Sequence, residues 1–284
     1  MLVNIRKLKR KIVRSLSKFW IRSRLSLEKI PCPACGNENN FTVLQAKDRY
    51  GLPITTVRCP KCSLAFSNPA PTGLFLKTFY GTSMFRGLDW GILKPTRKIL
   101  QEFNAKNRAM NHLLFFDEII FPKFHNSARS ILDIGSSDGT FLLEFSNKYS
   151  QVLCFGVEPG KLFRNHSEKQ LTRVFDSLEE ISKDETFDYI TAWHVLEHSR
   201  DPKLFLKRVR DHMSDSSLLI FEVPDFDRYD NSIRPFHIDH ICHFNETVIR
   251  RILTDVGLSV LGVYRENKYL SDNIYGIKLI AKRR

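Results

Sequence analysis

The carboxyl-terminal half of the sequence predicts an α/β fold built on an open, mainly parallel sheet. From Ser130 onwards, short apolar runs of strand length alternate with amphipathic stretches of helical length. This alternation is typical of parallel sheets, because each parallel connection needs a crossover. The last two runs have no helical stretch between them, around 267–273. They therefore predict an antiparallel hairpin at one edge of the sheet.

The elements of this sheet can be placed in chain order. The strand-like runs are 130–134, 152–157, 187–193, 217–223, 259–263 and 275–281, with a further short strand expected just before Asp176. The helical stretches are 140–149, 161–169, 202–212 and 246–255. Each helical stretch carries apolar residues at spacings of three and four, which places them on one face.

Composition excludes several classes of protein. The chain has 284 residues, of which 42% are hydrophobic and 26% charged, so it can bury a sizeable core in one large domain or two unequal ones. Six cysteines are too few for a disulfide-stapled secreted scaffold. No run approaches the roughly 18 apolar residues of a membrane span. We therefore expect a globular, cytoplasmic protein.

The first thirty residues carry most of the net charge. They hold ten Lys or Arg and one acid, Glu28, which is +9 of the total +13. The rest of the chain is only mildly basic, so nucleic-acid binding by the whole protein is not expected. The apolar positions that share one helical face are Ile5, Leu8, Ile12, Leu16 and Phe19. Such a helix could lie in an anionic bilayer interface at the inner face of the membrane or pack on its own protein, and a transit peptide is a third interpretation.

Two closely spaced cysteine pairs form a C-x2-C…C-x2-C array, Cys32 with Cys35 and Cys59 with Cys62. Four thiolates about 2.3 Å from one ion give a closed tetrahedral zinc site. Because no coordination position stays open, we expect structural zinc, with a small β ribbon over 36–58. The alternatives are two redox-active pairs, or disulfides in an oxidising compartment.

A turn of small residues joins the first strand to the first helix in ILDIGSSDGTF (131–141). Gly135 and Gly139 allow a sharp turn and a close approach to a ligand. Glu158 follows the second strand about twenty residues later, where a carboxylate can accept both ribose hydroxyls of an adenosine. Neither a P-loop nor a G-x-G-x-x-G fingerprint is present, since Ser137 and Thr140 occupy two of the required glycine positions.

These pieces together resemble the class I S-adenosylmethionine-dependent methyltransferases. The matching segments are LDIGSSDGTFL (132–142), GVEP (156–159), FDYITAWHVLEH (187–198), LLIFEVP (218–224) and DHICHFN (239–245). Ser137 replaces the middle glycine of the family's Gly-x-Gly-x-Gly loop. The resemblance implies a Rossmann-like sheet of seven mostly parallel strands in the order 3-2-1-4-5-7-6, with strand seven antiparallel.

The resemblance also implies S-adenosylmethionine as the cofactor and a set of residues around it. We expect its contacts to come from Asp133, Gly135, Ser137, Gly139, Glu158, Asp176, Ser177 and His194. Asp133 should lie beneath the cofactor and accept hydrogen bonds from loop amides, and His194 should lie beside it. Asp176 and Ser177 are candidates for the adenine edge.

A four-cysteine module fused to such a domain is similar to the sugar methyltransferases of bacterial polysaccharide and deoxysugar pathways. In those enzymes a His-Glu-His-like stretch before a Phe carries the base. Here Asp239 and His240 fall at that place, with Asp for Glu, and His198 matches the histidine after strand four. Tyr80 is a candidate aromatic of the substrate pocket. The resemblance thus implies a sugar or glycan acceptor and leaves open whether oxygen, carbon or nitrogen is methylated.

Histidines gather in two loops that should border the active site. They are His194, His198, His237, His240 and His243. Loops at the carboxyl ends of parallel strands border ligand sites, and imidazole suits general-base chemistry near pH 7. We expect His240, and after it His198, to be the base, with Asp239 orienting a neighbouring imidazole. Alternatively, three histidines with Asp239 or Glu197 could bind a catalytic metal.

The chain therefore divides into four predicted segments. They are a basic amphipathic helix (1–30), a zinc-binding module (31–72), a helical linker or cap (73–128, clearest over 96–120) and a methyltransferase domain (129–284). We expect methyl transfer to a nucleotide-sugar, lipid-linked glycan or polysaccharide. An RNA methyltransferase is the alternative, although WHVLEH (193–198) stands where base-methylating enzymes carry Asn/Asp-Pro-Pro-Tyr/Phe. A non-catalytic, cofactor-binding scaffold at the membrane is a third possibility.

Overall fold

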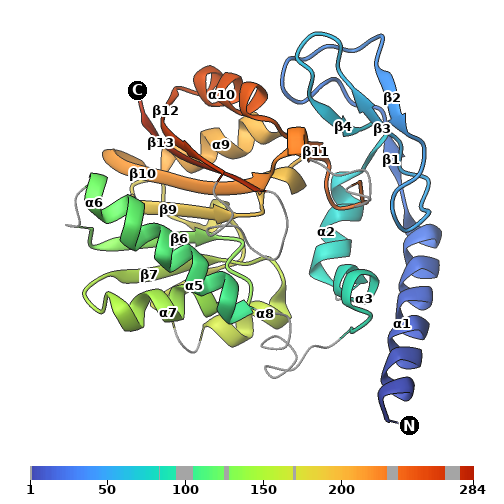
Figure 1. Ribbon diagram of the computed structural model, residues 1–284, viewed down its shortest axis with the longest axis horizontal. Coiled ribbons are helices and arrows are strands. Elements are labelled where there is room, and N and C mark those ends of the chain that lie inside the picture. The colour runs from blue at the N-terminus through green and yellow to red at the C-terminus, as the bar shows by residue number, and fades with distance from the viewer. Residues whose placement is uncertain are drawn as a thin grey trace.

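A seven-stranded sheet forms the centre of the molecule (Figure 1). The computed structural model describes residues 2–82, 84–93, 105–124, 128–168, 171–228, 236–265 and 276–284. The helical pattern predicted over 96–104 and the hairpin turn predicted at 267–273 lie outside these residues. The strands are β6 (Ser130–Ile134), β7 (Leu153–Val157), β8 (Arg173–Phe175), β9 (Phe187–Trp193), β10 (Met213–Pro224), β12 (Leu258–Tyr264) and β13 (Gly276–Arg283).

The strands of this sheet are mostly parallel. They lie side by side in the order β12-β13-β10-β9-β6-β7-β8. Numbered one to seven in chain order, they run 3-2-1-4-5-7-6 across the sheet. β13 pairs antiparallel with both of its neighbours, β10 and β12, and the other pairs are parallel. Five neighbouring strands therefore direct their carboxyl ends to one edge of the sheet, where a ligand site is expected. They are β8, β7, β6, β9 and β10.

Helices cover both faces of the sheet (Figure 1). The helices around it are α5 (Ala105–Phe115), α6 (Phe121–Phe124), α7 (Thr140–Lys148), α8 (Lys161–Ser167), α9 (Pro202–Asp211) and α10 (Glu246–Asp255), with a π-helical turn at Phe116–Ile120. Successive strand residues point to opposite faces. Ile131 packs in the buried cluster under α5 and α7, whereas Leu132 packs in the cluster under α9 and α10.

Side chains at the helix starts explain where two of these helices begin. The Asp201 carboxylate accepts a hydrogen bond from the Leu204 amide at 2.9 Å, and Pro202 occupies the first turn of α9. The Asn245 side chain accepts one from the Val248 amide at 3.0 Å at the start of α10. These caps satisfy amides that have no partner within the helix, so the sequence could place both helix starts.

The cysteine-bearing segment forms a four-stranded antiparallel sheet with one strand from far along the chain. Its own strands are β2 (Thr42–Gln45), β3 (Thr56–Arg58) and β4 (Ala65–Ser67), and β11 (Cys242–His243) pairs with β4. The small ribbon predicted over 36–58 is thus part of a larger sheet. β1 (Leu27–Glu28) and β5 (Ala70–Pro71) form a separate short pair. Buried side chains of this module share one cluster with the α9 side of the central sheet.

Three helices from the first part of the described chain lie beside the module. They are α1 (Leu2–Arg24), α2 (Gly73–Gly81) and α3 (Met84–Trp90). α1 runs along the outer edge of the molecule, with the amino terminus at its far end (Figure 1). It packs against α3. Among the described residues, no helix combines the length and the apolar character that crossing a bilayer requires.

Candidate active site

A cavity of about 560 Å³ opens at the carboxyl ends of the strands β6, β7 and β8. Gly135 and Ser137, which follow β6, line one side of it. Glu158 follows β7, and Asp176 and Ser177 follow β8, and these three line the cavity as well. His194 lines the same cavity, so the structure brings together six of the eight residues predicted to contact the cofactor.

The loop after β6 turns through left-handed backbone conformations. The φ angles are +75° at Gly135, +52° at Ser137 and +78° at Gly139. A Cβ on Gly135 would lie 2.6 Å from Cγ2 of Val195, so that position requires glycine. Gly139 lines neither this cavity nor the second cavity that adjoins it. Its missing side chain instead makes room for Ser167 on α8, which corrects the prediction that it approaches the ligand.

Glu158 is fixed in place by two backbone amides. Its carboxylate accepts hydrogen bonds from the Ser137 amide at 2.9 Å and from the Gly160 amide at 2.7 Å. Each carboxylate oxygen can accept a second bond, so two ribose hydroxyls could still be held. Burial raises the pKa of Glu158, and the amides and the nearby charge of Arg86 oppose that rise. The residues present thus fit an adenosine.

The hydrogen-bond partner of Asp133 differs from the one predicted. The side chain is 3% exposed and accepts a hydrogen bond from the Thr191 hydroxyl at 2.6 Å. The sequence suggested loop amides as its partners. Thr191 is on β9, the neighbouring strand, so Asp133 ties two strands together below the site. Burial raises its pKa to about 7, although the Thr191 hydrogen bond lowers it.

A second cavity of about 350 Å³ adjoins the first. Both are lined by Gly135, Ser137, His194, His198 and Tyr80. The second cavity is lined on its far side by residues of the histidine loop, namely His237, Asp239 and His240. A group bound in the first cavity and a group bound in the second would therefore meet beside His198 and His194.

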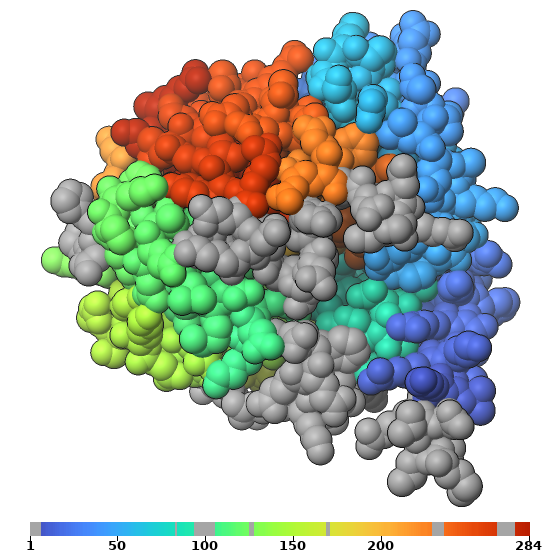
Figure 2. Space-filling model, in the orientation of Figure 1, coloured from blue at the N-terminus to red at the C-terminus, as the bar shows by residue number. Residues whose placement is uncertain are grey.

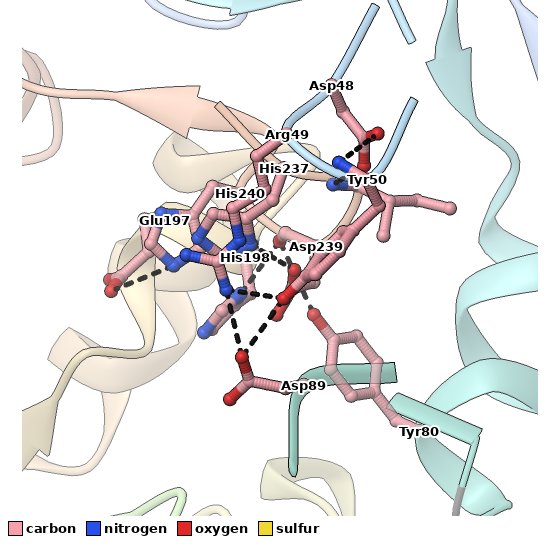
Figure 3. A network of polar contacts seen from close by, with 11 residues as sticks. Asp48, Arg49, Tyr50, Tyr80, Asp89, Glu197, His198, His237, Asp239 and His240 are labelled. Carbon is pink, nitrogen blue, oxygen red and sulfur yellow. Dashed lines mark hydrogen bonds and ion pairs between the residues drawn. The ribbon is translucent and has the colours of Figure 1, made fainter. Parts of the chain in front are cut away.

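One backbone carbonyl fixes His198. Its Nδ1 lies 2.7 Å from the carbonyl oxygen of Asp239, and the Tyr80 hydroxyl donates to the same oxygen at 3.4 Å (Figure 3). A carbonyl oxygen can only accept, so Nδ1 of His198 carries the proton. The neutral imidazole then has its lone pair on Nε2. His198 is thereby held as the tautomer that can accept a proton at Nε2.

His237 and His240, which lie near His198, have different surroundings (Figure 3). The Asp239 carboxylate bonds Nδ1 of His237, so the imidazole that it orients is His237. Burial raises the pKa of Asp239, but the charge and hydrogen bond of His237, with the charge of Arg49, outweigh burial and hold that pKa well below its usual range. Burial, with the charges of the neighbouring imidazoles, holds the pKa of His240 well below its usual value.

Potential metal ligands also converge here. The ligating atoms of Glu197, His198 and His240 lie within 4.8 Å of one another, as do those of His237, Asp239 and His240. The two groups share His240, whose Nδ1 is buried without a hydrogen-bond partner in the described part of the chain. One oxygen of the fully buried Glu197 carboxylate also lacks a partner there. The donor set is one that zinc or a similar cation would accept.

His194 lies between two buried carboxylates. Its Nδ1 is 3.2 Å from Glu197 and its Nε2 is 3.5 Å from Glu222. Glu222 in turn contacts Lys278 at 3.1 Å, and both side chains are 0% exposed. Burial lowers the pKa of His194, but the two carboxylates outweigh it and raise that pKa to about 10. His194 is thus protonated at neutral pH and cannot be the base that accepts a proton.

The protonated His194 should make stability depend on pH. Its pKa is raised to about 10 from 6.5, so its contribution is complete below pH 6.5 and is lost as the pH rises through about 10. We expect the difference in unfolding free energy between the wild type and His194→Gln to shrink over that range, by at most about 1.4 kcal/mol per pH unit. Urea titrations of both proteins at a series of pH values measure it. A difference that stays constant or grows would show that His194 is not protonated in the folded state.

The four cysteines form one cluster between two tight turns. Sγ of Cys32 lies 3.4 Å from Sγ of Cys62, and Sγ of Cys35 lies 3.5 Å from Sγ of Cys59. All four sulfurs lie within 4.8 Å of one another, and none is in a disulfide. Sulfurs at 2.3 Å from a tetrahedral ion would be about 3.8 Å apart. The cluster therefore fits a zinc ion.

The cysteine-bearing module holds the histidine loop in place. β4 pairs with β11, so that Phe66 lies opposite Cys242. The Asp48 carboxylate accepts from the Ile238 amide at 3.2 Å, and the Arg49 amide donates to the Phe236 carbonyl at 2.8 Å. The positions of His237 to His243 thus depend on the folded module, although they lie about 180 residues away in the chain.

Several residues of the site were not predicted. Arg86 lines both cavities, and its guanidinium lies over Phe85 at 4.3 Å and Trp90 at 4.1 Å. Burial lowers the pKa of Arg86 to about 10, so it stays charged at neutral pH. The only sequence signal for Arg86 is its position among aromatic residues. The only sequence signal for Glu222 and Lys278 is their opposite charge, at positions that lie opposite each other once β10 pairs with β13.

These features define a class of protein. The sheet order, the turn after the first strand and the carboxylate after the second describe a Rossmann-like domain that binds an adenosine-containing cofactor. Residues 99–263, more than half of the chain, match the family model described as a methyltransferase domain. The chain belongs to this methyltransferase family.

Curated relatives match part of the chain. An (S)-tetrahydroprotoberberine N-methyltransferase of Eschscholzia californica is 26% identical over 102 residues, which are 33% of this chain and 29% of that protein. A tRNA U34 carboxymethyltransferase of Dichelobacter nodosus is 27% identical over 115 residues, 38% of this chain and 36% of that protein. The chain thus spans about a third of the length of these relatives.

Solved structures share the fold. The magnesium protoporphyrin IX methyltransferase of Synechocystis with bound SAH has a TM-score of 0.53 and 12% identity, over 75% of this chain and 100% of that chain. Streptomyces venezuelae DesVI has a TM-score of 0.53 and 12% identity, over 66% of this chain and 96% of that chain. At this identity the likeness shows the fold alone.

Proposed function

We propose that this methyltransferase transfers the methyl group of S-adenosylmethionine to a sugar hydroxyl, with His198 as general base. The observation that carries the proposal is the hydrogen bond from Nδ1 of His198 to the Asp239 carbonyl. It leaves Nε2 free to take a proton at the place where the two cavities meet. A base in that position is useful for an acceptor that must lose a proton, as a hydroxyl must.

The lining of the second cavity supports a sugar as the acceptor. Its wall holds side chains that donate or accept hydrogen bonds, contributed by five separate segments of the chain. They include Arg49, Tyr80, Asp89, Arg108, Asp138, His237 and Asp239. Groups of both kinds around one cavity suit a ligand with many hydroxyls, which needs several fixed partners for orientation.

The residues of the chain have separate roles in this reaction. The cofactor supplies a methyl group made electrophilic by its sulfonium. Tyr80 and the Asp239 carbonyl hold His198, which takes the hydroxyl proton at Nε2 as the new O–C bond forms and the S–C bond breaks. The thioether leaves neutral, and the proton stays on His198 until it passes to solvent. Glu158 and the turn at Gly135 hold the adenosine, so that acceptor oxygen and methyl carbon can approach to about 3–3.5 Å.

A transfer assay tests the acceptor class. The full-length protein would be incubated with methyl-labelled S-adenosylmethionine and with sugar nucleotides or lipid-linked glycans in parallel. We expect label in a carbohydrate fraction, in an alkali-stable form as an ether requires. Label in added tRNA but in none of the carbohydrate fractions would contradict the proposal.

The same assay separates a general base from a catalytic metal. A cation held by His198 and His240 would activate the hydroxyl without the imidazole taking its proton. The cluster of four cysteines is a closed site, so a chelator that removes weakly held ions should leave it in place. We expect full activity after chelation and no stimulation by added Zn²⁺ or Mn²⁺. Activity that vanishes and returns with added metal would overturn the assignment of His198 as base.

A further inference from the structure

α1 presents an apolar stripe to solvent. The side chains of Leu8, Ile12, Leu16 and Phe19 are 58%, 50%, 60% and 74% exposed. They follow one another at spacings of four, four and three, so they share one face of the helix. A contiguous group of exposed, large apolar side chains marks an interaction surface for a protein or a membrane.

The attachment of α1 to the rest of the protein uses the opposite face. Ser17 and Ile21 are 1% and 0% exposed, and they lie roughly on the other side of the helix from the stripe. Glycines lie where α1 comes closest, Gly87 within α3 and Gly91 directly after it: a Cβ on Gly91 would lie 2.7 Å from the Arg10 carbonyl oxygen. The helix is thus held in place without its exposed apolar stripe. α1, drawn in dark blue, lies at the edge of the molecule (Figure 2).

Positive charge borders the stripe. α1 contains no acidic residue, and the basic positions along one flank of the stripe are Lys11, Lys18 and Arg22, with Lys9 on the other flank. Lys11 and Lys18 also line a hollow that reaches Arg49 and Asp89, and these last two line the second cavity of the active site as well. An apolar stripe with cations along its side is complementary to an anionic bilayer, which offers acyl chains below and phosphate headgroups above.

We propose that α1 is the docking surface of this enzyme for an anionic phospholipid bilayer. The helix lies in the plane of the interface, with the stripe toward the acyl chains and the basic flank among the headgroups. Because Arg49 and Asp89 connect that flank to the active site, docking places the second cavity next to the headgroup layer. This inference is independent of the acceptor and goes beyond the proposed function.

Vesicle sedimentation tests the docking surface. The full-length protein would be mixed with vesicles of phosphatidylcholine and phosphatidylglycerol, or of phosphatidylcholine alone. We expect sedimentation with the mixed vesicles, weakened by high salt, and a loss of at least about tenfold in partitioning for Leu16→Ser with Phe19→Ser. The matched control is Leu74→Ser with Leu153→Ser, which removes two apolar side chains that are 79% and 54% exposed elsewhere.

Charge variants and solution size complete the test. Lys11→Glu with Lys18→Glu should lose the preference for anionic vesicles, whereas Lys77→Glu with Lys183→Glu should retain it. The proposal is overturned if the wild type ignores the mixed vesicles or if the stripe variant binds them as the wild type does. It is also overturned if the wild type is a lipid-free dimer that the stripe variant converts to a monomer without any vesicle binding, because the stripe then pairs two copies.

Discussion

His198→Asn should lower kcat for methyl transfer by about 10²–10⁴-fold. The asparagine amide can still donate to the Asp239 carbonyl in place of Nδ1, so the local structure is retained, but no group remains to take the proton at Nε2. The affinity for S-adenosylhomocysteine should stay within a few-fold of the wild type. Initial rates at saturating concentrations of the methyl donor and the acceptor measure the effect.

Two other histidine variants make this prediction specific. His166→Asn, on α8, is a control with no expected effect on rate. His240→Asn should cost less than His198→Asn, because burial and neighbouring imidazoles hold the pKa of His240 well below its usual value and make it a poor proton acceptor. If His240→Asn abolished turnover while His198→Asn left it intact, the base would be His240, which was the first expectation from the sequence.

Cys59→Ser should lower methyl transfer by about 10²-fold or more without a comparable loss of cofactor affinity. We propose that the cysteine cluster holds a structural zinc ion. Without it the module should loosen, and the pairing of β4 with β11 would no longer fix His237 to His243. A displacement of about 1 Å at the reacting groups is enough for such a loss.

Metal content and activity together decide this second prediction. Elemental analysis should give one zinc per wild-type chain and less for Cys59→Ser. Cys154→Ala is the matched control, because Cys154 is equally buried but lies outside the cluster, and it should retain both zinc and activity. A zinc-free Cys59→Ser protein with wild-type turnover would show that the module does not position the histidine loop.

The sequence could predict those features that local patterns carry. The strands β6 and β9 begin and end where the apolar runs do, and α10 begins at the residue after its Asn245 cap. The turn after β6 and the carboxylate after β7 have fixed places in a parallel sheet, so Glu158 and Gly135 could be located from the order of residues alone. The four cysteines can be recognised as a metal-binding array from their spacing alone.

The remaining features arise from contacts between distant segments. β11 is two residues long and has no periodicity of its own, so its pairing with β4 had no sequence signal. The partner of His198 is a backbone carbonyl, which every residue has. The face of α1 that packs on α3 could not be read from the sequence of α1, because Gly87 in α3 and Gly91 after it determine which side of α1 comes close. The apolar stripe that the sequence showed is the face left outside.

The pairing of Lys278 with Glu222 belongs to the same group. A lysine inside an apolar strand is usually at the surface, yet this one is fully buried. Only the register of β10 against β13, which places the two directly opposite, makes the burial acceptable. Register between antiparallel strands depends on the intervening chain and on the core, and neither can be read from the strand itself.

The turn at Gly135 and the Glu158 carboxylate should hold the adenosine of the cofactor. Isothermal titration of the zinc-loaded protein with S-adenosylhomocysteine tests it without any acceptor. We predict one binding site per chain, and a loss of about 10²-fold in affinity for Glu158→Ala, since two hydrogen bonds to a charged group would be lost. Glu168→Ala, an exposed carboxylate on the neighbouring segment, should bind as the wild type does. No heat of binding from the wild type, or equal affinity for Glu158→Ala, would contradict the account.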